Sequence, residues 1–185
     1  MATMTDGDWD ALISATATAY TGLVFTHAAW HKLCDFGSFI GFVANYQIVP
    51  ACVAPAIARV IVAAEVCVTL ALIVPGQRDI GAYLAIAILL AYSGAMTANI
   101  VRGRKRVECG CGSAPQFLNW SLVLRNIVLS GIAALVLRTH AYGLSAGEVV
   151  IAMACGFTLW TVFVLIEQIL GNASRAQVSR EDRDS

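Results

Sequence analysis

The chain has 185 residues, of which 58% are hydrophobic and only 13% are charged, and its formal net charge is zero. Soluble domains carry about 25% charged residues, so this composition, with a mean hydropathy of +0.73, excludes an ordinary soluble domain and indicates an integral membrane protein. The basic residues cluster in connecting segments and form no face for nucleic acid, so the expected partner is the lipid bilayer and no nucleic acid.

Apolar runs divide the chain into candidate membrane helices, because about 20 apolar residues are needed to cross the hydrocarbon. There are five such runs, at residues 11–30, 51–74, 80–101, 115–137 and 149–170. After the first run, Phe36, Phe39, Ile40 and Val43 share one helical face, which predicts a short interfacial helix.

The predicted fold is an all-α integral membrane helical bundle of about five transmembrane helices with one short interfacial helix. Residues 1–171 are expected to form a single transmembrane bundle domain. Residues 172–185 are rich in charged and small side chains and are expected to be a disordered charged tail. The first ten residues are acidic, whereas a signal peptide begins with a basic region, so no cleavable signal peptide is expected.

The main polar interruption runs from Arg102 to Asn126, where a basic segment precedes Cys109 and Cys111. The thiolate is the reactive form of cysteine, and the pKa of a thiol falls beside basic residues and near a helix start. A disulfide across one intervening residue is strained, and strained disulfides exchange readily. The pair therefore suits thiol–disulfide exchange, the alternative being two loop cysteines without a role.

The alternation of five crossings is expected to bring Cys34, Cys52, Cys109 and Cys111 to one face of the membrane. Cys67 and Cys155 would then lie roughly 10 Å from the opposite surface. They are interpreted most simply as small packing residues, with a second redox pair as the alternative.

Four polar residues are expected within roughly 6 to 12 Å of the cysteine face: His27, Arg59, Arg125 and Asn126. An ionisable group inside a membrane usually faces a cavity or a partner. Two arginines at similar depth therefore indicate a pocket for an anionic or carbonyl-bearing ligand. The alternative is that Arg125 and Asn126 bind backbone carbonyls and lipid phosphate. Glu65 is expected to lie too deep to pair with Arg125.

A zinc site is the metal alternative, with Cys34, His27 or His31 joining the cysteine pair. Structural zinc sites usually present two cysteines separated by two to four residues. The spacing here differs, so no metal site is expected, and His27 with His31 is interpreted as a pair at the membrane interface.

Several segments together resemble one family. They are Cys109-Gly110-Cys111-Gly112, Leu122 to Asn126, Lys32-Leu33-Cys34-Asp35 with Phe39, and Tyr46-Gln47-Ile48-Val49-Pro50. This pattern is similar to the MauE family of methylamine-utilisation membrane proteins and to the wider DoxX-like group, over roughly Tyr20 to Leu137. Many relatives have Phe between the second cysteine and the glycine, whereas here Gly112 follows Cys111 directly.

The resemblance implies a membrane thiol–disulfide redox protein for maturation of the β (small) subunit of methylamine dehydrogenase. It implies Cys109 and Cys111 as the catalytic pair and Cys34 as the candidate resolving thiol, with Arg125 and Asn126 in support. The implied partners are a MauD-like thioredoxin-fold protein and that subunit, and the implied location is the bacterial inner membrane, with several crossings. The core would then be similar to the four-helix bundles of DoxX and vitamin K epoxide reductase.

Two other functions stay open. One is a non-catalytic membrane scaffold for the partner or the subunit, and the other is a quinone-linked oxidoreductase of the DoxD type, with a quinone near Arg59 and Arg125. Two inferences about the orientation in the membrane conflict. Most basic residues, including Lys32, are assigned to the cysteine face. The positive-inside rule then places the thiols in the cytoplasm, whereas the implied partner and substrate are periplasmic.

Overall fold

The computed structural model of the chain describes residues 6–103, 118–138 and 144–184. Its helices are α1 (Asp6–Cys34), α2 (Phe36–Asn45), α3 (Ala54–Ile73), α4 (Arg78–Val101), α5 (Trp120–Leu135) and α6 (Ala146–Asp184), and the 3-10 turn η1 (Ala51–Val53) leads into α3. The prediction of an all-α membrane helical bundle with a short additional helix is confirmed.

Three helical segments are long and apolar enough to cross a membrane, judged by length and composition. They are Ala51–Ile73, Arg78–Val101 and Ala146–Asn172. The five long helices correspond to the five expected apolar runs, and α5 is the shortest of them. The count of five membrane crossings stays a prediction.

The helix boundaries follow from local capping. Asp35 ends α1 and begins α2, because its carboxylate accepts a hydrogen bond from the backbone N–H of Ser38 at 3.2 Å. In the same way, Asn119 accepts from the backbone N–H of Leu122 at 3.0 Å, so α5 starts at Trp120. That is later than the expected start at Pro115, which lies outside the described residues.

The last helix is longer than the sequence suggests. It continues without interruption through Asp184, so residues 172–184 are helical where a disordered tail is expected. No proline occurs after Pro115, and Gly171 is the last glycine. Nothing in the local sequence therefore forces the helix to end at the membrane surface.

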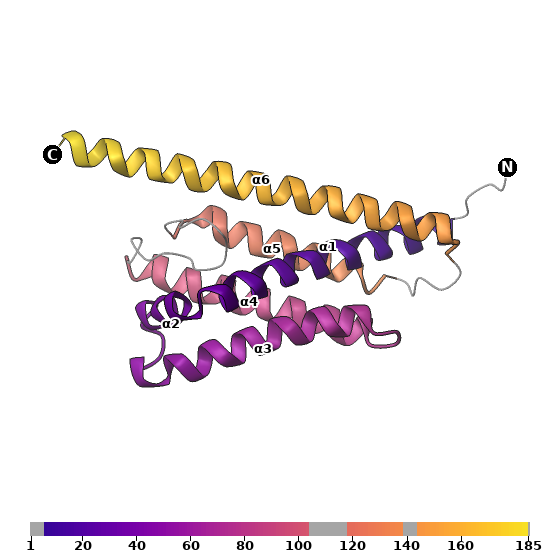
Figure 1. Ribbon diagram of the computed structural model, residues 1–185, viewed down its shortest axis with the longest axis horizontal. Coiled ribbons are helices and arrows are strands. Elements are labelled where there is room, and N and C mark those ends of the chain that lie inside the picture. The colour runs from indigo at the N-terminus through magenta and orange to yellow at the C-terminus, as the bar shows by residue number, and fades with distance from the viewer. Residues whose placement is uncertain (1–5, 104–117, 139–143, 185) are drawn as a thin grey trace.

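The long helices alternate in direction along the chain, so α1, α4 and α6 run one way and α3 and α5 run the other (Figure 1). One end of the bundle, here called the cysteine end, therefore holds the C-terminus of α1 with Cys34, the helix α2, and η1 with Cys52. The end of α4 and the start of α5 pack together there, since Ile100, Leu118 and Leu122 form one buried cluster.

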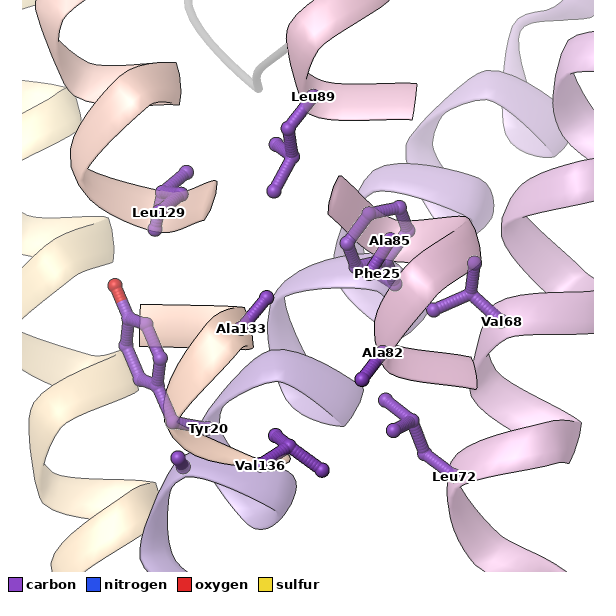
Figure 2. Packing of buried hydrophobic residues seen from close by; sticks show 11 residues of the cluster. Tyr20, Phe25, Val68, Leu72, Ala82, Ala85, Leu89, Leu129, Ala133 and Val136 are labelled. Carbon is purple, nitrogen blue, oxygen red and sulfur yellow. The ribbon is translucent and has the colours of Figure 1, made fainter. Parts of the chain in front are cut away.

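Most of the apolar core lies between α1, α3, α4 and α5, and Figure 2 shows their side chains converging. Many of these side chains are small, which lets the helices approach closely; the fully buried ones include Ala82, Ala85 and Ala133. The helix α6 packs on α1, where a Cβ on Gly156 would lie 2.7 Å from the Cβ of Ala19.

Polar contacts hold the helices together at the end opposite the cysteines. The Nη2 atom of Arg78 donates to Ser14 Oγ at 3.0 Å and to Thr18 Oγ1 at 2.8 Å. Ser14 Oγ in turn donates to the carbonyl oxygen of Val136 at 3.0 Å. These bonds join α1, α4 and the end of α5. A second group of polar side chains lies nearer the middle of the bundle.

Candidate functional site

Two ion pairs lie inside the bundle. Lys32 of α1 pairs with Glu65 of α3, and the two side chains are 3% and 1% exposed. Arg125 of α5 pairs with Glu167 of α6, at 18% and 11% exposure. A charged side chain inside a membrane protein is costly unless a partner neutralises it. Glu65 and Glu167 therefore each neutralise one buried basic side chain.

The Lys32–Glu65 pair includes a third group. The hydroxyl of Tyr92 donates to the same Glu65 oxygen, Oε1, at 2.6 Å, and it lies 3.4 Å from Lys32 Nζ. The ammonium also lies 5.3 Å from the ring centre of Phe39 and 5.2 Å from that of Tyr92, positions that favour a cation. Residues of α1, α2, α3 and α4 thus hold one positive charge.

This group lies well inside the bundle. Glu65 comes eleven positions after Ala54, the first residue of α3, which is roughly 16 Å along the helix at 1.5 Å per residue. Tyr92 comes nine positions before Val101, the last residue of α4, or roughly 14 Å from that end. Both values place the ion pair near mid-membrane for a bundle that spans the bilayer.

A small polar cavity of about 40 Å³ connects the two ion pairs. Its charged and polar lining residues are His27, Lys32, Glu65, Tyr92, Arg125, Asn126 and Glu167. They come from all five long helices. Such a volume admits a small number of water molecules. Chemically, the arrangement is an ionisable network that could hold or relay protons.

A larger, apolar chamber of about 380 Å³ lies beside the polar cavity, between α2, α3 and α4. Lys32 and Tyr92 line both spaces, so they form the boundary between the polar cavity and the apolar chamber. The remaining lining of the chamber is aliphatic and aromatic, with Phe39, Ile61 and Met96 among its members.

The predicted polar residues divide into two groups. Arg125 and Asn126 line the polar cavity together with His27, whose ring lies 4.7 Å from that of His31 and 5.7 Å from that of Trp160. Arg59 is exposed and lines neither space, so the prediction that it shares a buried pocket with Arg125 is wrong.

The position of Arg59 has a simple helical cause. The inward stripe of α3 consists of Ala54, Ala58, Val62, Glu65, Val68 and Leu72, at spacings of three and four residues. Arg59 falls outside this stripe, although its distance along the helix is compatible with the cysteine end. A similar distance along their helices therefore does not place Arg59 and Arg125 in one pocket.

The four cysteines within the described ranges are free thiols and are exposed. Cys34 and Cys52 lie at the cysteine end, and Cys67 and Cys155 lie on outward faces of α3 and α6, so these two are not buried packing residues. Cys109 and Cys111 lie outside the described residues. Within those residues, no group of three or more His, Cys, Asp or Glu side chains is placed to hold a metal ion.

Four members of the network were missed from the sequence as site residues: Lys32, Glu65, Tyr92 and Glu167. A signal was present, because Glu65 and Glu167 are isolated acids inside apolar runs, and such residues need a basic partner. Lys32 was counted as a loop charge for the positive-inside rule. That assignment is wrong, since its side chain is buried and paired.

The comparison with known proteins agrees with the resemblance. A family model described as Methylamine utilisation protein MauE matches residues 10–139. Methylamine utilization protein MauE of Paracoccus denitrificans is 31% identical over 166 residues, which cover 88% of this chain and 89% of that protein. The MauE protein of Methylophilus methylotrophus is 28% identical over 167 residues, covering 88% of each chain. No solved structure matches. This chain belongs to the MauE family.

Proposed function

We propose that this chain is a methylamine-utilisation protein of the bacterial inner membrane that performs thiol–disulfide exchange during maturation of the β subunit of methylamine dehydrogenase. One observation supports this most directly. Gly103 and Leu118, which flank the segment containing Cys109 and Cys111, belong to helix ends at the cysteine end, where Cys34 and Cys52 are exposed. The segment that carries the proposed pair therefore begins and ends at the end of the bundle where Cys34, the candidate resolving thiol, is exposed.

The exchange can be written with a balance of electrons. A thiolate of the partner attacks one sulfur of the Cys109–Cys111 disulfide, which forms a mixed disulfide and releases the other cysteine as a thiolate. A second thiolate of the partner then attacks the mixed disulfide. The partner is oxidised to a disulfide, and the two electrons remain on Cys109 and Cys111. A MauD-like thioredoxin-fold protein is the proposed partner. Cys34 is the proposed resolving thiol where the partner's second thiol does not act: its thiolate attacks the chain's own sulfur in the mixed disulfide, forms a disulfide with it and releases the partner as a thiolate.

Arg125 and Asn126 take a supporting role in this proposal. They lie in the second turn of α5, the helix that follows the cysteine segment, and they line the polar cavity below the cysteine end. Because Arg125 pairs with Glu167 and Asn126 is buried, this turn of α5 is fixed relative to α6. Their function would be to position the segment that carries the thiols.

Trapping the mixed disulfide tests the proposal. Cys109→Ser and Cys111→Ser would be expressed separately with the thioredoxin-fold partner, quenched with acid and examined on a non-reducing gel. Neither single variant can form the Cys109–Cys111 disulfide, so the complex would form in the reverse direction, by attack of the remaining thiolate on the partner's disulfide. One single variant should accumulate this complex, and the double variant, which lacks both thiols, should not. Cys67→Ser and Cys155→Ser serve as matched controls, because both thiols are exposed on outward helix faces; neither should trap the partner or reduce maturation.

The same variants separate exchange from the scaffold function. A scaffold needs no thiols, so the double variant would still yield active methylamine dehydrogenase. If it does, and neither single variant forms a complex, thiol exchange is excluded. If the double variant gives no active enzyme and one single variant forms the complex, the exchange function is established.

A further inference from the structure

The apolar chamber beside the ion-pair network has the features of a ligand site. Its volume of about 380 Å³ lies in the range of small-molecule pockets, about 300 to 1,000 Å³. Its walls come from α2, α3 and α4 and are almost entirely apolar. Ile48 and Val60 line it and are exposed apolar residues. A ligand entering past them would come from a hydrocarbon environment.

The polar side of the chamber offers one hydrogen-bond donor group, the ammonium of Lys32, since the Tyr92 hydroxyl already donates to Glu65. Lys32 and Tyr92 line the chamber, whereas Glu65 lines only the polar cavity behind them. The ammonium of Lys32 has three N–H groups; Glu65 accepts one of them and the Tyr92 hydroxyl oxygen another, at 3.4 Å, which leaves one for a ligand. The ligand that fits would therefore present an acceptor, such as a carbonyl oxygen, to this side.

The charge of the site selects against an ionic headgroup. Glu65 already neutralises Lys32, so an added phosphate would leave an uncompensated negative charge in a buried position. A phospholipid also keeps its headgroup at the membrane surface, whereas the donors here lie roughly 14 to 16 Å along α3 and α4 from their ends at the cysteine end. A neutral, carbonyl-bearing, lipid-soluble molecule satisfies both conditions.

We propose that this chamber binds a membrane quinone, with one carbonyl oxygen of the ring accepting a hydrogen bond from Lys32 and the apolar tail lying toward Ile48 and Val60. The proposal places the quinone away from Arg59, which lines neither space. It concerns binding alone and goes beyond the proposed thiol function. It can therefore fail or succeed independently of Cys109 and Cys111.

Two neighbouring alanines of α3 provide a matched pair of variants. Ala64 lines the chamber, whereas Ala63 is exposed and does not. Ala64→Phe should fill part of the chamber and reduce quinone affinity about tenfold or more. Ala63→Phe adds the same side chain on an outward position of the same helix, so it should leave the affinity unchanged.

The headgroup contact needs a variant that keeps the interior neutral. Lys32→Met alone would leave Glu65 buried without its base, so Lys32→Met is combined with Glu65→Gln. The purified full-length chain in lipid nanodiscs would be titrated with decylubiquinone, with dodecylbenzene as a probe that lacks carbonyl groups. The double variant should bind decylubiquinone about tenfold more weakly than the wild type, through the loss of a charge-assisted hydrogen bond.

Each result decides the proposal. Saturable decylubiquinone binding that Ala64→Phe weakens and Ala63→Phe does not would support it, provided that dodecylbenzene binds at least about tenfold more weakly. Equal binding of the two probes would show a general apolar cleft and overturn the quinone assignment. Unchanged affinity in Ala64→Phe would overturn the location. The variant that lacks both Cys109 and Cys111 should bind quinone normally, whether or not these cysteines perform thiol–disulfide exchange.

Discussion

Glu65 of α3, a member of one ion pair, and Asn126 of α5, the neighbour of Arg125 in the other, line the same small polar cavity. Among the described residues, neither Glu65 Oε2 nor Asn126 Nδ2 has a hydrogen-bond partner. One atom is an acceptor and the other a donor, and buried polar groups are rarely left unsatisfied. A water molecule in the cavity would satisfy both and connect the two ion pairs into one network.

The first prediction is that Glu65 and Asn126 are energetically coupled. The free energy of unfolding would be measured for Glu65→Gln, Asn126→Ala and the double variant. Because both side chains share the cavity, the sum of the single effects should differ from the double effect by about 0.5 kcal/mol or more.

Asn99 gives the control for this cycle. It is fully buried on α4, and its amide donates to the carbonyl oxygen of Ala95 at 3.1 Å, but it does not line the cavity. Glu65→Gln and Asn99→Ala should add to within about 0.5 kcal/mol. Additivity in the Glu65–Asn126 cycle as well would show that no water connects them.

The second prediction concerns the contact between α1 and α6. A Cβ on Gly156 would lie 2.7 Å from Ala19 Cβ and 3.1 Å from the backbone nitrogen of Tyr20. Gly156→Leu should therefore separate the helices and lower the free energy of unfolding by about 1 to 3 kcal/mol. Thermal unfolding in detergent would measure the loss.

Gly131→Leu is the matched control for Gly156. Gly131 lies in α5 with no atom within 4 Å of an added Cβ, apart from the backbone of its own helix. Leucine has a higher helix propensity than glycine, by roughly 0.5 to 1 kcal/mol, so this variant should unfold at the same or a higher temperature. Equal destabilisation by both substitutions would show that α1 and α6 do not approach closely at Gly156.

The helices were predictable from the sequence because each depends on local properties. Apolar length marked the five long helices, and the stripe containing Phe36 and Phe39 marked α2, which the structure places at Phe36–Asn45. The start of α5 was less predictable, since Pro115 and Asn119 are both acceptable helix-start residues. The structure shows Asn119 as the cap.

The ion-pair network was less predictable because it depends on which helices are neighbours. Glu65 pairs with Lys32 and not with Arg125, as expected, but Glu65 and Arg125 line the same small cavity, so the expectation that Glu65 lies too deep is wrong. The sequence could not show that Lys32, two positions from the end of α1, would extend inward to Glu65. Nor could it show that α6 lies beside α1 and so brings Glu167 to Arg125.

The third prediction concerns pH and the start of α2. A hydrogen bond from the Ser38 side chain, and then one from its backbone N–H, lower the pKa of Asp35 below its usual value. A depressed pKa means that the folded state favours the carboxylate. This contribution to stability is fully present above the unfolded pKa, about 3.9, and is lost as the pH falls through the lower folded value.

Hydrogen exchange at the start of α2 would measure this effect. Protection of the Ser38 and Phe39 amides, corrected for intrinsic exchange, should fall as the pH is lowered below about 4. Asp35→Asn keeps a good N-cap residue without a titrating group, so its protection should change less over the same range. Identical pH profiles for the two proteins would contradict a role for the Asp35 carboxylate.

The last prediction concerns Arg125 and Glu167, which join α5 to α6 while α6 packs along α1. Arg125→Leu would leave the Glu167 carboxylate buried without its base. Breaking a buried pair in this way costs about 3 kcal/mol or more. Glu167→Gln should have a comparable effect, because the guanidinium then lacks its acid. Chemical unfolding of the chain in detergent micelles would give both values.

The exchanged pair, Arg125→Glu with Glu167→Arg, separates the structural from the positioning role of Arg125. It restores one acid and one base across the same two helices, so it should recover part of the lost stability. Function should not return with it if the guanidinium must lie on α5, in the second turn after the cysteine segment. Maturation of methylamine dehydrogenase by the exchanged variant would be assayed beside its unfolding. If stability and maturation both recover, Arg125 serves only to pair α5 with α6. Recovery of stability alone would show that its position on α5 matters for function.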